Sequence, residues 1–173
     1  MAVSLYEVSV GTYRQILGGV VGVLDKGRQH CQESGIELPD LVETSLYPDM
    51  LPLRFQLLSV VHHSLGAIDG VKAGVFSPPQ QNPDVDYDGL QQLVVDASAS
   101  LGALTADEVN GLEGNDMEFR MGDFSMPFTA EGFLLSFSLP NFYFHATTTY
   151  DILRSKGVPV GKRDFMGQPK LRA

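Results

Sequence analysis

The sequence predicts an all-α protein, a four-helix bundle with a small β-hairpin before its last helix. Long stretches carry apolar residues at the three- and four-residue spacing of helices that are buried on one face. One short stretch instead alternates apolar and polar residues, as strands do. The predicted helices cover residues 6–30, 48–73, 89–101 and 129–156, and the predicted hairpin covers residues 117–128.

The length and composition of the chain are those of one globular domain. Its 173 residues are 43% hydrophobic and 19% charged, which suits a chain with a single core. Cys31 is the only cysteine, so we expect no internal disulfide and a reducing, cytoplasmic setting. The first residues lack a signal-peptide pattern, and the longest apolar run, residues 16–24, is about half a membrane span. We therefore expect no membrane partner.

Charge is distributed unevenly along the chain. The net charge of −9 argues against nucleic acid as a partner. From residue 154 onward there are six basic residues and one acid, a net of +5, so the first 153 residues carry −14. We predict one domain over residues 1–173, in which residues 157–173 form an extended basic tail that packs on the acidic body. A tail that binds an anion or a partner is the alternative.

The first helix has one apolar face and several glycines. Gly18, Gly19 and Gly22 each cost a helix about 1 kcal/mol relative to alanine. We therefore interpret these glycines as places where another helix approaches closely. The apolar face consists of Tyr6, Val10, Tyr13, Leu17, Val20, Val21 and Leu24.

The second and third helices are marked by proline, glycine and aspartate. Residues 36–48 form a connector with one short helical turn near Leu41, and Pro52 suits the first turn of the helix that follows. Gly74 ends that helix, and residues 77–89 form a loop before the third helix.

The hairpin turns at Gly122 and Asp123, and Thr129 is a good N-cap for the last helix. Pro140 should kink that helix, because it removes one backbone hydrogen bond and clashes with the preceding turn. Gly157 should end it. We expect the tail beyond Gly157 to be extended rather than helical, and to lie over the mouth of a site or at a dimer seam.

Two stretches resemble binding motifs that they do not complete. DVDYDG, residues 84–89, resembles the start of an EF-hand loop, but Val95 stands where the bidentate glutamate is needed. GVPVGKR, residues 157–163, lacks the glycine spacing and the hydroxyl residue of a P-loop. We therefore predict neither calcium nor nucleotide binding, and expect the aspartates of DVDYDG to cap the third helix.

Histidines are the strongest candidates for chemistry, because imidazole is a base, a proton shuttle and a metal ligand. His30 is expected at the surface. His62 and His63 are neighbours on the second helix and point about 100° apart, so they should not face the same site. His63 lies with Gln56 at the edge of the apolar stripe, so we predict that His63 points inward.

The last helix carries a polar strip at i, i+4 and i+7, formed by Asn141, His145 and Thr148. A polar strip inside a bundle is costly unless its hydrogen bonds are made. His145 is therefore either a core histidine with its hydrogen bonds satisfied or a site residue, and the pattern leaves both interpretations open.

Three motifs resemble the DinB/YfiT-like superfamily, and more closely a branch of it catalogued as a domain of unknown function. These motifs are SLYEVSVGTY, LYPDMLPLRFQ and LPNFYFHATTTYDILRSKGVPVGKRDFMG, and the resemblance covers nearly the whole chain. It implies helices in up-down-down-up order, a homodimer, and a divalent metal on three histidines that activates a small thiol or water.

The resemblance carries over only in part. His63, or else His62, matches the ligand on the second helix, and His145 matches the first histidine of an H-x-x-x-H on the fourth. Thr149 stands where the second histidine should be. A hydroxyl replaces imidazole poorly, so we expect no tightly bound zinc, nickel, iron or manganese.

Three functions remain open. The first is a small-molecule enzyme or binding protein without a tightly held metal, in which His145 is the general acid or base. The second is a metal-dependent transferase, isomerase or hydrolase that uses His63 and His145 with a non-histidine ligand. The third is a non-catalytic, dimeric interaction protein. For the first, the predicted catalytic residues are His145, Tyr143 and Asn141, and the predicted substrate-binding residues are Gln56, His63, Thr148 and Tyr13.

Overall fold

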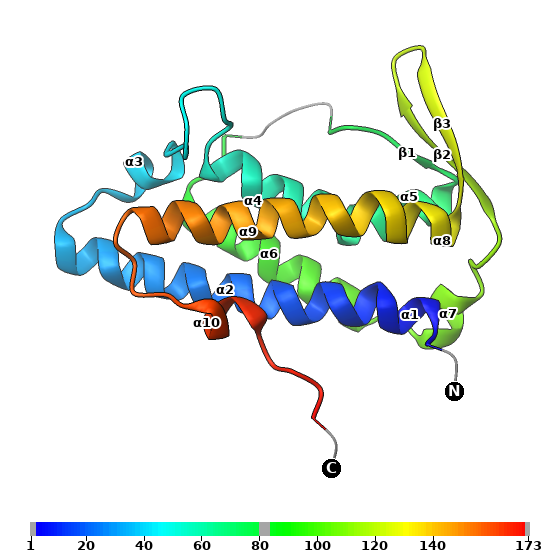
Figure 1. Cartoon of the computed structure of the whole chain (residues 1–173), viewed down its shortest axis with the longest axis horizontal. Helices are drawn as coiled ribbons and strands as arrows, with labels where there is room; N and C mark the ends of the chain where they lie inside the picture. Colours follow the sequence, from blue (N-terminus) through cyan, green and yellow to red (C-terminus); the bar gives the residue numbers. More distant parts are fainter. Residues whose placement is uncertain (1–2, 80–83, 172–173) are drawn as a thin grey trace.

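The computed structural model describes residues 3–79 and 84–171, which are mostly helical with a small three-stranded sheet (Figure 1). The long helical segments lie side by side, so that α2 packs on α6 and α9, and α4 packs on the same two helices. No helix within the described residues is long and apolar enough to cross a membrane. The long helices are α2 (Val10–Ser34), α4 (Leu53–His62), α5 (Leu65–Ala73), α6 (Tyr87–Gly102) and α9 (Leu139–Ser155).

Contacts between helices define their relative directions. α9 runs in the same direction as α2, since Tyr13 meets the ring of Phe142 near one end and Gly27 meets Leu153 near the other. α6 runs against α2, and α4 with α5 runs against α9 (Figure 1). The fully buried side chains of these helices form one core, whose largest members include Tyr13, Phe133, Phe142, Leu17 and Leu57.

The first helix is longer than predicted. α1 (Leu5–Val8) precedes α2, and the two meet at Ser9, whose hydroxyl donates to the carbonyl of Leu5. α2 ends at Gly35, which adopts φ 69°. The short helix α3 (Leu38–Val42) then appears where a turn near Leu41 was predicted.

The second helix is not continuous, and our prediction of one helix over residues 48–73 is wrong in two respects. α4 begins only at Leu53, and the helix breaks at His63 and Ser64 before α5 starts. The Ser64 hydroxyl donates to the carbonyl of Val60, and such local bonds compete with regular helix geometry. Gly74 ends α5 at φ 74°, as predicted.

The sheet joins the predicted hairpin to a strand that the sequence pattern did not reveal. β2 (Asp116–Met121) pairs antiparallel with β3 (Phe124–Thr129), which confirms the hairpin. β1 (Val75–Phe76) pairs parallel with β2 and sets Phe76 opposite Phe119. Two residues are too few to show a period. The short helix α7 (Ala106–Asn110) was also not predicted, although Thr105 and Glu108 form a capping box.

Asp86 caps the third predicted helix, α6, as expected, because its side chain accepts a hydrogen bond from the Gly89 N–H. Thr129 caps the last helix in the same way through the Gly132 N–H. The last helix consists of α8 (Ala130–Phe133), the π-helical segment η1 (Leu134–Ser138) and α9. The irregularity predicted at Pro140 therefore takes the form of a wider helical turn just before it, where the carbonyls that would meet the proline ring lie.

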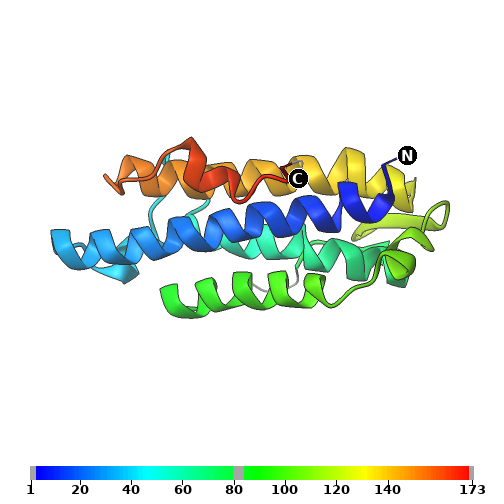
Figure 2. The ribbon, with the colours of Figure 1, turned by 90° about the horizontal axis from the view of Figure 1, so that it is seen from below.

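The tail is not wholly extended, contrary to our expectation. Lys162–Met166 forms the short helix α10, which lies against α2 (Figures 1 and 2). Lys26 pairs with Asp164 at 2.7 Å, and the Gln15 amide donates to the Met166 carbonyl at 2.9 Å. The start of the helix is stabilised because the Asp164 carboxylate accepts a hydrogen bond from the Gly161 N–H.

Glycines of α2 have different roles. A Cβ built on Gly19 would lie 2.3 Å from the Phe165 carbonyl oxygen, whereas Cβ atoms on Gly18 and Gly22 would meet nothing within 4 Å. Close approach, as predicted, is therefore real at Gly19, but the partner is α10 rather than a long helix. At Gly18 and Gly22 no such approach exists.

We predict that Gly19→Ala and Gly18→Ala change stability in opposite directions. Gly18→Ala should stabilise the protein by about 0.5–1 kcal/mol through helix propensity. Gly19→Ala should destabilise it by about 1–3 kcal/mol, because the backbone of α10 must move. Urea denaturation measures both free energies, and limited proteolysis should cleave the tail faster in Gly19→Ala only. Equal stability of the two variants would contradict the close contact.

Candidate functional site

The candidate site is a hollow of about 230 Å³ between α4, β1, β2, η1 and α9. Phenylalanine rings from four of these elements form much of its wall, namely Phe55, Phe76, Phe119 and Phe137. Pro78 and Pro79 also line it, together with Ser59, Asn141 and three histidines, His62, His63 and His145. Within the described part of the chain, no aspartate, glutamate, lysine or arginine lines this hollow.

His145 is held in one tautomer by Gln56. The Gln56 amide donates through Nε2 to the Leu51 carbonyl at 2.8 Å, which leaves its Oε1 to face His145 Nδ1, also at 2.8 Å. Because an amide oxygen only accepts, the assigned hydrogen bond places the proton of the neutral ring on Nδ1. The lone pair of His145 then lies on Nε2, which makes no hydrogen bond within the described residues.

Burial keeps His145 neutral. Loss of hydration lowers the pKa of His145 to about 4. Gln56 offers no negative charge to offset this cost of burial. At pH 7 the ring therefore accepts protons or hydrogen bonds through Nε2 and has no proton there to donate.

His63 lies beside His145, with ring centroids 5.8 Å apart and planes inclined by 13°. Burial, followed by the positive charges that His62 and His145 would carry, lowers the pKa of His63 to about 3. The His63 Nδ1 atom is buried and has no hydrogen-bond partner among the described residues. A buried polar atom without a partner costs free energy, so this atom is a place where a ligand group could stabilise the protein.

His62 lines the same hollow as His63, which corrects our prediction that the two could not face one site. The prediction assumed a continuous helix, but α4 ends at His62. His62 Nε2 donates to the Ser77 carbonyl at 2.9 Å, and its ring lies 4.3 Å from that of Phe76. Burial lowers the pKa of His62 as well.

A chain of buried hydroxyls supports the helix break next to the hollow. The Ser138 hydroxyl donates to the His63 carbonyl at 2.6 Å, so its oxygen accepts from the Tyr13 hydroxyl at 2.8 Å. Tyr13, which we predicted to bind substrate, is fully buried and does not line the hollow. Burial raises the pKa of Tyr13, which keeps its hydroxyl available as a donor.

The other predicted site residues separate into three groups. Asn141 lines the hollow and donates through Nδ2 to the Phe137 carbonyl at 2.8 Å. Gln56 is buried behind His145 and positions it without lining the hollow. Tyr143 and Thr148 do not line the hollow, since Tyr143 is 41% exposed and the Thr148 hydroxyl donates to the Phe144 carbonyl.

Sequence reasoning missed the phenylalanine wall and Ser138. Ser138 lies three residues before Asn141 and seven before His145, so extending the polar strip of the last helix backwards would have found it. Phe76 had no local signal, because its position depends on the pairing of β1 with β2.

The described residues do not form the three-donor metal set that the resemblance implies. No group of three or more His, Cys, Asp or Glu residues within residues 3–79 and 84–171 is arranged to hold a metal ion. Thr149 is fully buried, and its hydroxyl donates to the His145 carbonyl rather than facing the hollow. The described residues therefore do not reproduce the three-histidine set that the resemblance implies.

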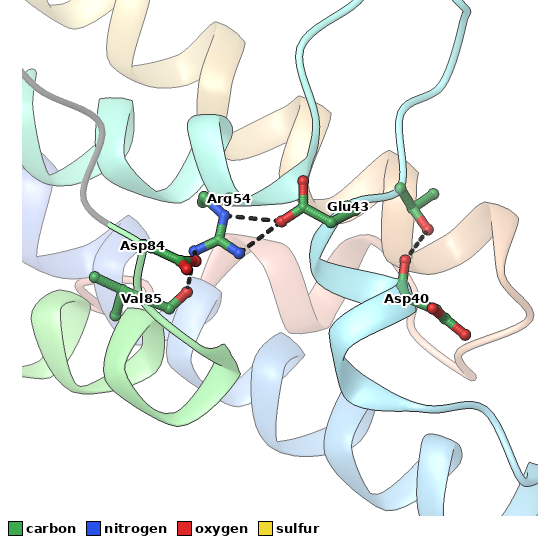
Figure 3. A network of polar contacts seen from close by, with 6 residues as sticks. Asp40, Glu43, Arg54, Asp84 and Val85 are labelled. Carbon is green, nitrogen blue, oxygen red and sulfur yellow. Dashed lines mark hydrogen bonds and ion pairs between the residues drawn. The ribbon is translucent and has the colours of Figure 1, made fainter.

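A larger hollow, of about 440 Å³, lies elsewhere, next to Arg54. Arg54 is already satisfied there, because it pairs with Glu43 at 2.6 Å and Asp84 at 2.9 Å and donates to the Val85 carbonyl (Figure 3). These bonds tie the start of α4 to the segments after α3 and before α6. We take the smaller hollow as the candidate site, because it is lined by His63 and His145, which have ring nitrogens without a partner among the described residues. In the larger hollow the charged group, Arg54, is already paired.

We predict that Ser138→Ala disturbs the site, whereas Ser136→Ala, in the same π-helical segment, does not. Ser138→Ala leaves the buried Tyr13 hydroxyl and His63 carbonyl without their partner, which should cost about 1–3 kcal/mol. Ser136 is exposed, so its change should stay within about 0.5 kcal/mol. Urea denaturation measures the cost, and the NMR resonances of the His63 ring should shift only in Ser138→Ala. Identical spectra and stabilities for the two variants would show that Ser138 supports nothing.

We predict that His63 and His145 make the protein sensitive to mild acid. Their pKa values are about 3 and 4 in the folded protein and near 6.5 when unfolded. The unfolded state therefore binds more protons below pH 6.5, so stability is complete above pH 6.5 and falls as the pH drops toward 4. The Tm of His63→Gln/His145→Gln should fall less between pH 7 and 4.5 than that of the wild type.

The control for this titration is His30→Gln, which removes a histidine distant from the hollow. Its loss of Tm between pH 7 and 4.5 should match that of the wild type. If the double variant also loses as much as the wild type, the buried histidines do not govern acid stability.

Comparisons with known proteins extend these observations. A DinB family member protein from Shewanella denitrificans has a solved structure similar to this one, with a TM-score of 0.82 and 21% sequence identity, over 98% of this chain and 95% of that chain. At this identity the likeness concerns the fold alone. A search of curated proteins found no match. Residues 5–166 match the family described as Domain of unknown function (DUF1993), and the chain belongs to that family.

Proposed function

We propose that this protein binds a small molecule in the hollow beside His145, as an enzyme or a ligand-binding protein, without a tightly bound metal. The observation that carries the proposal is the pairing of His145 Nδ1 with Gln56, which directs the lone pair to Nε2 in a ring that lines an open hollow. A core histidine kept only for packing would be enclosed, with both nitrogens bonded. His145 has one bonded nitrogen and one without a partner in the described residues.

The reactions available at this site are those of a neutral imidazole. His145 Nε2 accepts a hydrogen bond from a hydroxyl, thiol or N–H group of the ligand. In an enzyme, it would take that proton as the ligand reacts and return it to the product, which is general base and then general acid catalysis. The low pKa of His145 makes it a weak base. Such a reaction would therefore require a ligand group whose own pKa falls in the transition state.

The metal-dependent alternative is favoured by one observation. His63 has a buried nitrogen without a partner, and His145 lies next to it with an uncommitted Nε2. Two imidazoles and a non-histidine donor would hold a divalent ion weakly, and a ligand such as a thiol would complete the coordination. The missing third donor is the reason that we place this alternative second.

We also infer that the fold is the DinB/YfiT-like four-helix bundle in up-down-down-up order. The directions of the helices support this inference, because α2 and α9 run one way while α4 with α5 and α6 run the other. The solved DinB family structure supports it at the level of the fold.

We predict that small organic molecules bind at His145. A fragment library with uncharged, acidic and basic members, screened by NMR against the labelled protein, should yield compounds that shift the His145 ring resonances at millimolar concentration. The His30 ring should not respond. In His145→Phe, which keeps a ring and removes both nitrogens, the same compounds should bind at least fivefold more weakly. A screen in which no compound shifts His145 would overturn the proposal.

The same preparations distinguish the metal-dependent alternative. Protein purified without a histidine tag is assayed for metal, and zinc, nickel, iron and manganese are titrated into wild type and His145→Ala. We expect no stoichiometric metal in either protein. Stoichiometric metal in the wild type that is lost in His145→Ala would contradict the metal-free form of the proposal and favour the alternative.

A further inference from the structure

We propose that the hollow beside His145 accepts an uncharged aromatic molecule that carries one proton donor, with a phenol as the simplest member of the class. This inference rests on the proposed function and narrows it, because it names which small molecules the site selects. Three features of the hollow carry it: the rings of its wall, the absence of charge in its lining, and the kind of hydrogen-bonding atoms that it leaves uncommitted.

The wall of the hollow is aromatic. Phe119 and Phe137 pack with centroids 5.0 Å apart, and Phe76 lies 6.4 Å from both. On the other side, Phe55 stands edge-on to the His145 ring, with centroids 5.8 Å apart. A flat ring entering between these groups would make edge-to-face and offset contacts, which exceed simple burial of apolar area by about 0.5–1.5 kcal/mol per pair.

The lining carries no charge to compensate a charged ligand. The histidines lose their positive charge through burial, and no acidic or basic side chain lines the hollow within the described residues. A carboxylate or an ammonium would lose its hydration without gaining a counter-ion, which is costly.

Recognition of a proton donor rests on His145, whose uncommitted ring nitrogen is an acceptor. His145 offers the lone pair of Nε2, since its Nδ1 proton is used by Gln56. Asn141 donates one Nδ2 hydrogen to the Phe137 carbonyl, so its oxygen remains as an acceptor and its second Nδ2 hydrogen as a donor. A ligand that brings a hydroxyl, a thiol or an N–H group satisfies such acceptors, whereas an ether or a ketone does not.

The volume limits the ligand to about one substituted ring. The hollow measures about 230 Å³, which is below the usual range for drug-sized ligands of about 300–1,000 Å³. An apolar cavity of about 150 Å³ is enough to hold benzene. A phenol with a short substituent therefore matches the available space.

The test compares four probes that share one ring. Phenol, anisole, benzoate and benzylammonium are titrated at pH 7 into the wild-type protein, and the His145 and His63 ring resonances are followed by NMR. Phenol is uncharged at this pH, and anisole replaces its donor by a methyl ether. We expect saturable binding of phenol, binding of anisole that is roughly five- to tenfold weaker, and no saturable shift with either charged probe.

The variant His145→Phe checks that the donor is recognised by His145. It should bind phenol and anisole equally, because the ring contacts remain while the acceptor is lost. If His145→Phe fails to fold, the ratio of phenol to anisole affinity in the wild type still decides the point, and equal affinities there would overturn the recognition of a donor.

The remaining outcomes separate this inference from the proposed function. Saturable binding of benzoate or benzylammonium at His145, with phenol weaker, would overturn the ligand class and leave the site itself standing. Failure of all four probes to shift His145 would also overturn the class. The fragment screen would then decide whether the hollow binds any small molecule at all.

Discussion

The hydrogen bond from the Ser138 hydroxyl to the His63 carbonyl joins the two irregular helices from which the hollow is built. A helix that breaks in the protein interior exposes carbonyls that must find a partner, and Ser138 supplies that partner at 2.6 Å. Ser138 reaches it from the π-helical turn before Pro140, and Tyr13 completes the chain from the core. The hollow therefore depends on two departures from regular α-helix that satisfy each other.

The chemistry of the hollow follows from how its histidines are buried. Each of the three has a lowered pKa, and the first cause in every case is lost hydration rather than a neighbouring charge. His62 and His145 each place one ring nitrogen against a neutral carbonyl oxygen, from Ser77 and Gln56 respectively. Neutral acceptors orient an imidazole without charging it, which for His145 leaves the lone pair of Nε2 without a partner among the described residues.

Tight backbone contacts hold the parts of the chain that lie away from the hollow. α10 approaches α2 so closely at Gly19 that a methyl group would overlap the Phe165 carbonyl, and Gly167 makes a similar approach to the Gln15 carbonyl. Arg54 joins the segments before α4 and α6 through Glu43 and Asp84. The basic tail thus packs on α2 through α10, and none of its described residues lines the hollow.

The sequence by itself determined the hairpin, the approximate extent of the long helical segments and several of their ends, because apolar periodicity, the stops at Gly74 and Gly157, and the caps at Asp86 and Thr129 act over one or two turns. It also placed Asn141 and His145 on one face of the last helix, since their four-residue spacing survives folding. Only the tertiary structure decided that the second helix breaks at His63, that His62 joins the hollow, and that Tyr13 serves the core. Those outcomes depend on a hydroxyl 75 residues away and on pairing between strands, and local patterns carry no information about contacts of that range.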